Sequence, residues 1–350
     1  AIEIDFTNSE IIYISGNGGI YKSYDGGANW TVIGDATFTA LSHAISDIKL
    51  STTNNQILFI ASDEGLFKSI DGGNNFTLIM NGNFIEIEFH PNNPNTMYFV
   101  KQAGDSTLFF RSDDGGNTLA NFTNGWPNPN SVGGEQKRTE IAISPASPDK
   151  IVALATGSAN GGSGLYGIYI SDDKGENWTF QCCGPQPAGA PSSTNINMMG
   201  WQPDGSDDGG QYYYDLGLAV NPINADIIHV GGVQHWISFD NGVSFTCPAK
   251  WSEPHKKGYV HADIHDINYF GNDLWFACDG GIFYSDNAGD SIYKKQYGIA
   301  GADFWGFGAG FKDGEVMLGG TYHNGTMLKD GNTYINDWLC TDGGDGIRGF

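Results

Sequence analysis

The run His261-Ala-Asp263-Ile-His265 has the residue types and spacing best suited to chemistry. Residues two apart on a β-strand point to the same face, so a strand here would bring two imidazoles and a carboxylate together. Such a group can bind a transition metal or transfer a proton. The alternative is a structural hydrogen-bonded cluster between two sheets, the more usual role of buried His and Asp. We predict these three residues as ligand-binding residues and as candidate metal ligands.

Paired carboxylates are a second source of chemistry. A retaining or inverting glycosidase needs two of them about 5–10 Å apart, and Asp215 and Asp263 both fall where we expect innermost strands. They are the catalytic pair that we predict if the protein is a hydrolase. A sialidase is disfavoured, because it clamps its substrate with three arginines. The chain has only Arg111, Arg138 and Arg348, and Arg111 lies beside an outer-strand turn.

Aromatic residues gather in the same part of the chain. They are Trp201, Tyr212, Tyr213, Tyr214, Trp236, Trp251 and Tyr259. Flat rings beside carboxylates suit sugar binding, because a ring covers the apolar C–H face of a pyranose while acidic groups take its hydroxyls. Packing between sheets is the competing role for most of them. We predict Trp201, Tyr212 and Tyr214 as ligand-binding residues.

A repeated turn motif must position these residues. Its spacing is S-x-D-x-G-x-x-aromatic, and copies recur about every 40–50 residues, which is typical of β-propeller blades. Leu119 and Ile292 replace the aromatic residue in two copies, and Asn287 replaces one Asp. The six structural carboxylate or amide positions are Asp25, Asp71, Asp114, Asp173, Asp240 and Asn287.

The physical role of this motif is a hairpin turn. Each copy follows a run with the alternation of a strand, such as residues 19–23 or 65–69. The carboxylate accepts hydrogen bonds from backbone N–H groups across the turn, and the glycine adopts positive φ. The motif therefore specifies architecture strongly and function hardly at all.

These spacings predict an all-β fold, a propeller of four-stranded blades with about seven blades visible in residues 1–350. Residues 304–338 form a last blade without the motif. Residues 181–211 interrupt the repeat between blades four and five, and an insertion of this length is either functional or disordered. Its acidic, glycine-rich segment 204–210 is either a calcium site or a solvated loop.

Composition narrows the classes of partner. The 350 residues include 17 basic and 40 acidic side chains, a net charge of −23 that disfavours nucleic acid and anionic membrane surfaces. The sequence contains no run of about twenty apolar residues, so no membrane span is predicted. The five cysteines lack metal-binding spacing, and they predict either one or two disulfides in an exported protein or free buried thiols.

The motif resembles the Asp-box (BNR) repeat of sialidases, sortilin-type receptors and xyloglucanase-like propellers. The segments 214–222, 230–232, 259–265, 279–282, 319–326 and 343–346 further resemble large secreted Asp-box propeller proteins of Bacteroidetes, often labelled sortilin-like or "glycosyl hydrolase". This family implies export, commonly through a C-terminal type IX secretion sorting domain. One departure is Tyr322-His323, where the family usually has Gln-Asp. His323 is therefore a further candidate ligand-binding residue.

We predict a secreted or cell-surface propeller, a fragment of a longer chain, that acts as a binding or adhesion module. Its partners are a glycan or protein ligand and, if it is type IX cargo, the secretion machinery. One alternative is a glycan-active hydrolase that uses carboxylates facing the central channel. The other is a passive structural domain without a ligand.

Overall fold

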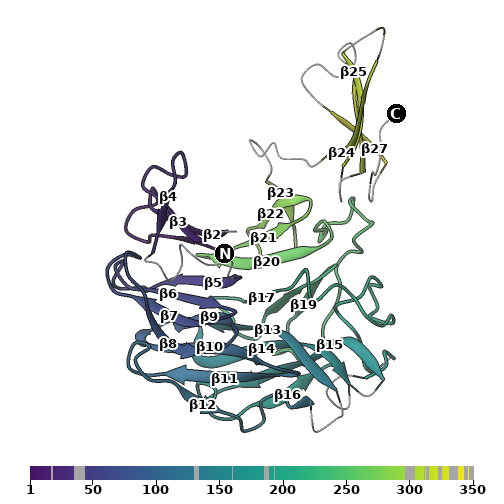
Figure 1. Ribbon diagram of the computed structural model, residues 1–350. Helices are drawn as coiled ribbons and strands as arrows, with labels where there is room; N and C mark the ends of the chain where they lie inside the picture. The colour runs from purple at the N-terminus through teal and green to yellow at the C-terminus, as the bar shows by residue number, and fades with distance from the viewer. Residues whose placement is uncertain are drawn as a thin grey trace.

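β-strands make up the regular secondary structure of this computed structural model (Figure 1). The structure describes residues 1–16, 19–34, 44–129, 134–159, 161–184, 189–192, 194–295, 304–310, 312, 315–321, 325–330, 338–342 and 346. Within these ranges there is no α-helix, and hence none long and apolar enough to cross a membrane.

The strands form seven antiparallel sheets, numbered here in chain order. Sheet one contains β1 (Ile2–Ile4), β2 (Ile12–Gly16), β3 (Gly19–Ser23) and β4 (Thr31–Ile33). Sheet two contains β5 (Ile45–Leu50), β6 (Leu58–Ser62), β7 (Gly65–Ser69) and β8 (Thr77–Asn81). Sheet three contains β9 (Phe84–His90), β10 (Asn93–Ala103), β11 (Ser106–Ser112) and β12 (Ala120–Phe122). Sheet four contains β13 (Glu135–Ser144), β14 (Ser147–Ala159), β15 (Gly162–Ser171) and β16 (Thr179–Cys182).

The remaining three sheets follow the same order. Sheet five contains β17 (Gly217–Val220), β18 (Ile228–Gly231) and β19 (His235–Ser238). Sheet six contains β20 (Ile264–Phe270), β21 (Asp273–Cys278), β22 (Gly281–Ser285) and β23 (Tyr293–Lys294). Sheet seven contains β24 (Phe304–Ala309), β25 (Val316–Thr321), β26 (Gly325–Asp330) and β27 (Leu339–Asp342). In sheet five an isolated bridge between Ile237 and Thr246 replaces a fourth strand, because Pro248 cannot donate to a ladder.

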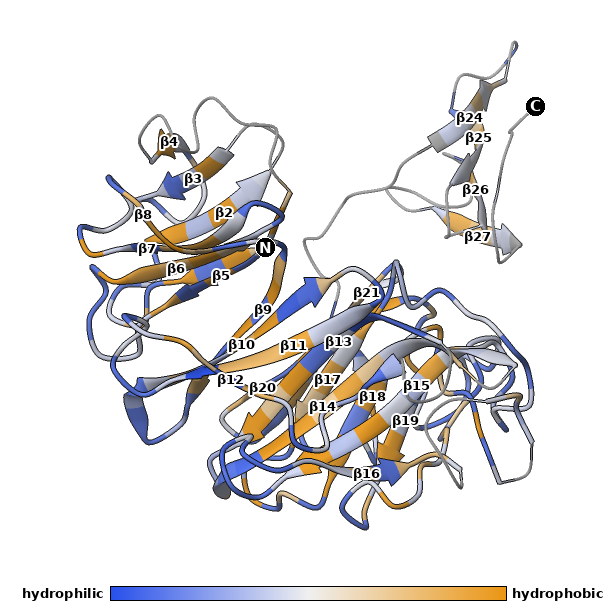
Figure 2. Cartoon of the chain, turned by 60° about the horizontal axis from the view of Figure 1, so that its bottom comes forward, coloured by the Kyte–Doolittle hydropathy of each residue, from blue (hydrophilic) through white to orange (hydrophobic). Residues whose placement is uncertain are grey.

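The first six sheets pack side by side, each against the next. Five apolar clusters fill the five junctions between them, and the cluster between sheets one and two, for example, includes Tyr13, Ile20 and Ile60. Hydrophobic residues accordingly concentrate on the strands and hydrophilic ones on the connections (Figure 2). Sheet seven contributes no described residue to these clusters, and it stands apart in both views (Figures 1 and 2).

The six motif copies fold as the predicted turns, which we call boxes. In each box the Ser hydroxyl donates to the Asp or Asn side chain at 2.8–2.9 Å and accepts from the Gly N–H at 2.8–2.9 Å. The Asp or Asn also accepts from the backbone N–H four residues later, at 2.8–2.9 Å. The predicted stapling of the turn is thus confirmed in all six boxes.

The boxes also join neighbouring sheets. Lys22 donates to the Gly72 carbonyl in the next box at 3.3 Å, and Lys68 donates to the Gly115 carbonyl at 2.7 Å. Arg111, in the same position of sheet three, donates to the Lys174 carbonyl at 3.2 Å. Each of these cations precedes its own box serine, so one turn is tied to the next along the molecule.

The box glycine permits close approach to the preceding sheet. Gly175 has φ +83°, and a Cβ atom there would lie 2.1 Å from the Phe109 ring. Gly104, in the β10–β11 turn, has φ +66° but no atom within 4 Å of such a Cβ. An added Cβ would thus meet backbone strain at both positions, but steric overlap only at Gly175.

We expect Gly175→Ala to destabilise the fold by roughly 2–4 kcal/mol, because left-handed strain and overpacking add. Gly104→Ala should cost only about 1 kcal/mol, from strain alone. Urea unfolding of both variants would measure this difference. Equal losses would show that the contact with Phe109 does not limit the junction.

Candidate functional site

Strand direction divides the molecule into two faces. Within each sheet the strands are antiparallel and follow one another in chain order. The start of the first strand and the turn between the second and third strands therefore lie at the same end of the sheet. We call this end the entry face. The boxes, between third and fourth strands, lie at the opposite end, which we call the box face. Chemistry on the entry face is therefore independent of the turns that define the fold.

Four titratable residues of sheets five and six gather at the entry face. Asp215 precedes β17 by two residues, Asp263 directly precedes β20, and His265 is the second residue of β20. Asp279 lies in the β21–β22 turn, and its backbone N–H donates to the Asp263 carbonyl at 3.2 Å. These residues come from two predicted segments and from one turn to which we assigned no function.

The expectation that His261, Asp263 and His265 share one strand face is wrong. β20 begins only at Ile264, and Asp263 has φ +62°, which no extended strand residue adopts. The other three described non-glycine residues with positive φ are Lys174, Asn241 and Ala288, all in boxes. Asp215 likewise lies before its strand rather than on it. The two carboxylates are thus held by the chain entering each sheet, not by the pleat.

His265 and Asp279 form a short ion pair at the centre of this group. His265 Nε2 donates to Asp279 Oδ1 at 2.7 Å, and this hydrogen bond raises the pKa of His265. The Tyr214 hydroxyl donates to the same oxygen at 3.4 Å, and the Tyr214 ring lies edge-on to the imidazole at 4.8 Å. The Tyr214 side chain is therefore oriented by His265 and Asp279. Their spacing in the sequence does not predict these contacts.

Asp215 is the most unusual member. Its side chain is 0% exposed, and apart from its own backbone N–H neither carboxylate oxygen has a hydrogen-bond partner among the described residues. Burial and the neighbouring Asp263 raise the pKa of Asp215 to about 7. Gln211 Nε2 donates to Asp263 Oδ1 at 3.0 Å. Both residues of the predicted catalytic pair therefore belong to one electrostatic group.

The structure does not bring His261, Asp263 and His265 together as one group, so the metal site stays a prediction. His261 Nδ1 lies 3.1 Å from the Ala262 carbonyl, and its ring packs over Gly280. No group of three or more His, Cys, Asp or Glu in the described ranges is arranged to hold a metal ion. His323 lies outside the described residues.

The aromatic residues divide into packing and exposed groups. Trp236 is a core residue, Tyr212 packs against the cluster between sheets four and five, and Tyr259 packs against the next one. The exposed rings are Tyr213 at 74%, Tyr214 at 42%, Trp201 at 41% and Trp251 at 37%. Tyr213 and Trp251 are exposed as well, although we did not predict them as ligand-binding residues, and Tyr213 is the most exposed of the four.

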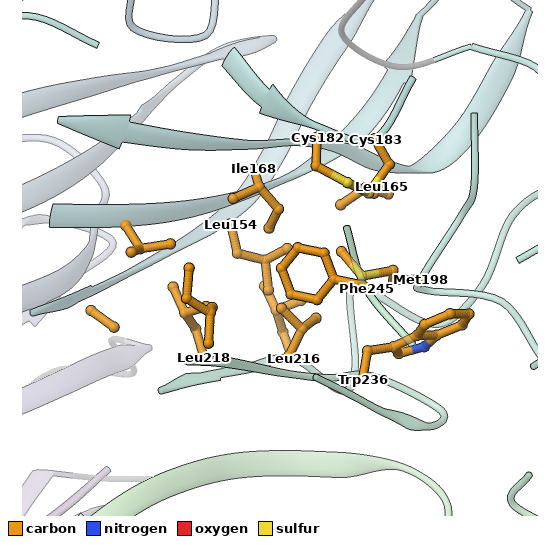
Figure 3. Close-up of a cluster of buried hydrophobic side chains, with 14 of the residues drawn as sticks. Leu154, Leu165, Ile168, Cys182, Cys183, Met198, Leu216, Leu218, Trp236 and Phe245 are labelled. Carbon is orange, nitrogen blue, oxygen red and sulfur yellow. A yellow bond between two sulfur atoms is a disulfide. The ribbon is translucent and has the colours of Figure 1, made fainter. Parts of the chain in front are cut away.

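The insertion folds against the sheet junction. Met198 and Phe245 pack near the Cys182–Cys183 disulfide at the start of the insertion (Figure 3). The buried Asn197 accepts from the Leu165 N–H at 2.9 Å and donates to the Gly209 carbonyl at 2.9 Å. This anchoring makes the insertion part of the entry face.

The acidic segment of the insertion is used internally. Asp207 accepts from the backbone N–H groups of Trp201 and Gln202, at 2.7 and 3.2 Å, and Asp208 accepts from that of Ser163 at 2.6 Å. These carboxylates stabilise loop geometry. The calcium site therefore stays a prediction without support from a ligand cluster in the described segment.

A second charged group, which we did not predict from the sequence, lies where the innermost strands of sheets one to four and six face one another. Its members project from innermost strands and are Glu3, Asp47, Lys49, Glu86, Glu88, Arg138, Glu140 and Asp266. Lys49 Nζ lies 2.8 Å from Glu88 Oε1, and Arg138 Nη2 lies 2.8 Å from Glu140 Oε1. We call this the axial cluster. The sequence pattern that could have predicted this cluster is the placement of charged residues two apart on a strand, as in Glu86-x-Glu88.

Burial dominates the electrostatics of the axial cluster. It raises the pKa of Glu3 to about 7 and that of Asp47 to about 6, although Lys49 opposes both shifts. Glu3 and Asp47 each accept a backbone N–H from the next sheet, those of Leu50 and Ile87, at 3.1 Å. The cluster therefore helps to join the sheets. Arg111 points away from it, as predicted, to the box of sheet four.

Comparisons with known proteins support the architecture. No protein-family model matches the chain, and no curated protein matches it. Among solved structures, a GH74 enzyme from Niastella koreensis matches with a TM-score of 0.56 and 16% identity over 99% of this chain and 60% of its own. The GH74 xyloglucanase from Xanthomonas campestris matches with a TM-score of 0.51 and 12% identity, over 98% of this chain and 58% of its own.

The fold is a β-propeller. The seven antiparallel sheets and these solved structures agree on it. The chain spans about three fifths of the length of either neighbour, and identities this low carry the fold alone. Function must therefore be argued from the residues of the entry face.

We expect Asp215→Asn to stabilise the protein increasingly as pH rises from about 4 to about 7. Unfolded Asp215 releases its proton near pH 4, whereas the folded carboxyl holds it to about pH 7. Wild-type stability therefore falls across this interval, and the variant lacks that loss. Thermal unfolding between pH 4 and 8 would show the Tm difference growing and then levelling.

Asp172→Asn is the matched control, because Asp172 is exposed in a box. It removes one carboxylate from an exposed position instead of a buried one. A difference for Asp215→Asn that shrinks with pH would mean that the folded protein stabilises the ionised carboxylate.

Proposed function

We propose that the protein is a glycan-binding propeller whose ligand lies on the entry face of sheets five and six. The observation that carries this proposal is the exposure of Tyr213 and Tyr214 on the turn that leads into the buried Asp215. A ring of this kind covers the apolar face of a pyranose, and nearby carboxylates accept its hydroxyls. Exposed rings and the carboxylate group of sheets five and six therefore lie side by side on one face.

Tyr214 is preorganised for this role. Its ring is set by His265 and its hydroxyl by Asp279, while Arg138 Nη1 donates to its carbonyl at 3.2 Å. A ring that is already fixed loses little conformational freedom on binding. This supports a binding surface rather than an incidental exposed side chain.

Two tryptophans extend the surface. Both lie in connections on the entry face, Trp201 in the insertion before β17 and Trp251 in the connection before β20. The Trp251 N–H donates to Gln234 Oε1 at 3.3 Å, which ties its loop to the β18–β19 turn. Several exposed rings on one face suit an extended polysaccharide better than a single sugar.

A second candidate function is glycan hydrolysis by Asp215 and Asp263. It is favoured by one observation, the raised pKa of Asp215 beside a second carboxylate, because a carboxyl group that keeps its proton near neutral pH can act as a general acid. The complete burial of Asp215 favours binding over catalysis. The Xanthomonas neighbour is a xyloglucanase, but at this identity its activity adds no support for any particular residue of this chain.

We also propose export to the cell surface or the extracellular medium, with type IX secretion as the route. The support is the resemblance of the second half of the chain to exported propellers, together with the Cys182–Cys183 disulfide, since disulfides persist in oxidising compartments. Quantifying the chain in cytoplasmic and extracellular fractions of its native cells would test this proposal.

We expect Tyr213→Ala to weaken binding to neutral polysaccharides by about tenfold, a loss of roughly 1.4 kcal/mol. Tyr24→Ala, which removes an exposed ring on the box face, should leave affinity unchanged. Isothermal titration against a panel of plant and algal polysaccharides would measure both. Equal affinities of the two variants would remove the entry face as the binding surface.

Reducing-sugar release, read from the same samples, separates the two functions. Binding without release supports the binding module. Release that is lost in Asp263→Asn but kept in Asp172→Asn assigns the hydrolase. Binding of a protein ligand with no response to any polysaccharide would overturn both glycan functions.

A further inference from the structure

The box of sheet one lacks the neighbour that the other five boxes have. In sheets two to six, a Cβ atom on the box glycine would lie 2.1–3.5 Å from a side chain of the preceding sheet. Gly27 is the box glycine of sheet one. Apart from its chain neighbours, the only described residues within 4 Å of a Cβ there are Trp30 and Ile12 of its own sheet. Trp30 is 39% exposed, whereas its counterparts Phe76 and Trp178 are 8% and 5% exposed.

The side of sheet one that faces away from sheet two is apolar. It presents Ile12 and Ile14, which are only half-buried, and Val32, which is exposed. The residues at the first two of these positions in sheet two are Leu58 and Ile60, and both are fully buried beneath sheet one. Sheet one therefore carries one half of a junction without the other.

Sheet six has an uncovered side of the opposite kind. Trp275 and Tyr284 are directly paired across β21 and β22, and their rings lie 4.7 Å apart. They occupy the positions of Tyr13 and Lys22 in sheet one, where the pair is buried against sheet two. Trp275 and Tyr284 are only half-buried. Sheets one and six are thus the two ends of the row, each with one uncovered side.

The row of six sheets curves around the axial cluster. Burial raises the pKa of Asp266 in sheet six, and Lys49 of sheet two opposes this shift, so these two sheets face each other across the cluster. A β-propeller closes by repeating such sheets around its axis. A further sheet between sheets six and one would therefore complete the ring.

Sheet seven is apolar on both sides. One side presents Val316, Leu318 and Leu328, at the positions that Ile12, Ile14 and Tyr21 hold in sheet one. The other side presents Met317 and Met327, at the positions of Tyr13 and Ile20. A sheet that is apolar on both sides is stable only when both sides are covered. Sheet seven thus has the residues to contact two neighbours.

Lys329 supplies a polar contact for the same arrangement. It is paired with Met317 across β25 and β26, as Lys22 is paired with Tyr13. Lys22 donates to the Gly72 carbonyl of the next box, and its Nζ atom would lie 3.5 Å from a Cβ at Gly72. Gly26 holds this position in the box of sheet one, and a Cβ there would have no described atom within 4 Å.

We propose that sheet seven docks between sheets six and one in solution, with Lys329 donating to the Gly26 carbonyl and Met317 covering Gly27. Docking moves the sheet from the position in which it stands apart (Figure 1). The occupant is the sheet of the same chain, because sheets follow one another in chain order at all five existing junctions. The connection 295–303 is also similar in length to the connection 34–44, which joins the adjacent sheets one and two.

Docking also affects the entry face. The turn between the second and third strands of each sheet lies on this face, so the end of β25 at Thr321 and the start of β26 at Gly325 would join it. They would lie beside the β21–β22 turn, which holds Asp279. Ring closure therefore completes the face on which we place the ligand, although it does not depend on the glycan function.

Two matched pairs of spin labels test the docking. The test pair is Leu339→Cys in sheet seven with Ala28→Cys in the box of sheet one. The control pair is Val32→Cys in sheet one with Asn74→Cys in the box of sheet two, at the same positions of an existing junction. All four sites are exposed. Both pairs are made in a chain whose free cysteines are changed to serine, namely Cys247, Cys278 and Cys340.

Double electron–electron resonance should give the two pairs the same distance to within about 5 Å, half the spacing of packed sheets. A longer distance for the test pair overturns the proposal. A matching distance that disappears when labelled protein is diluted into unlabelled protein would place sheet seven of a second copy in the gap, and it also overturns the proposal.

Lys329→Met tests the assigned hydrogen bond. It should raise the fraction of test pairs at long distance by about tenfold, because it removes a charged donor to a carbonyl. Lys312→Met removes an exposed lysine just before β25 and should leave the distribution unchanged. The control pair shows that sheets one and two stay folded in both variants. An unchanged distribution in Lys329→Met would overturn the contact between Lys329 and Gly26.

Discussion

The fold depends on the hydrogen-bonded triad within each box, in which a serine hydroxyl joins an Asp or Asn side chain to a glycine N–H. The triad holds the glycine at positive φ, where the absence of Cβ lets the preceding sheet approach. The same turn presents a carbonyl to Lys22, Lys68 or Arg111 of that sheet. One local interaction therefore sets both the turn and the junction between sheets.

Because every box lies on one face, the opposite face is free to vary. The insertion, the turn before β17 and the β21–β22 turn all lie there, and none contains part of a box. Asp215 and the positive φ of Asp263 are the features that packing alone does not require. Unsatisfied and strained groups of this kind tend to mark functional positions.

The sequence predicted the six boxes, the strands of seven sheets and the membership of Asp215 and Asp263 in one group. It did not predict where β17 and β20 begin, since the apolar alternation continues through residues that the chain uses to enter each sheet. The buried pair His229 and His235, 3.0 Å apart, was also missed, because only the β18–β19 register brings the two rings together. The insertion has no periodic pattern of apolar residues. Its packing could not be predicted, because it depends on contacts with distant parts of the chain.

The five separate apolar junctions give the molecule the character of a linear array. Each sheet is stabilised by its own strands and by its immediate neighbours, so cooperativity passes from blade to blade rather than through one shared core. A defect at a single junction would weaken one link of this array, while the axial cluster still connects sheets that are not neighbours. The entry-face group sits across the last of these junctions, so the order of its residues follows the docking of sheet six on sheet five.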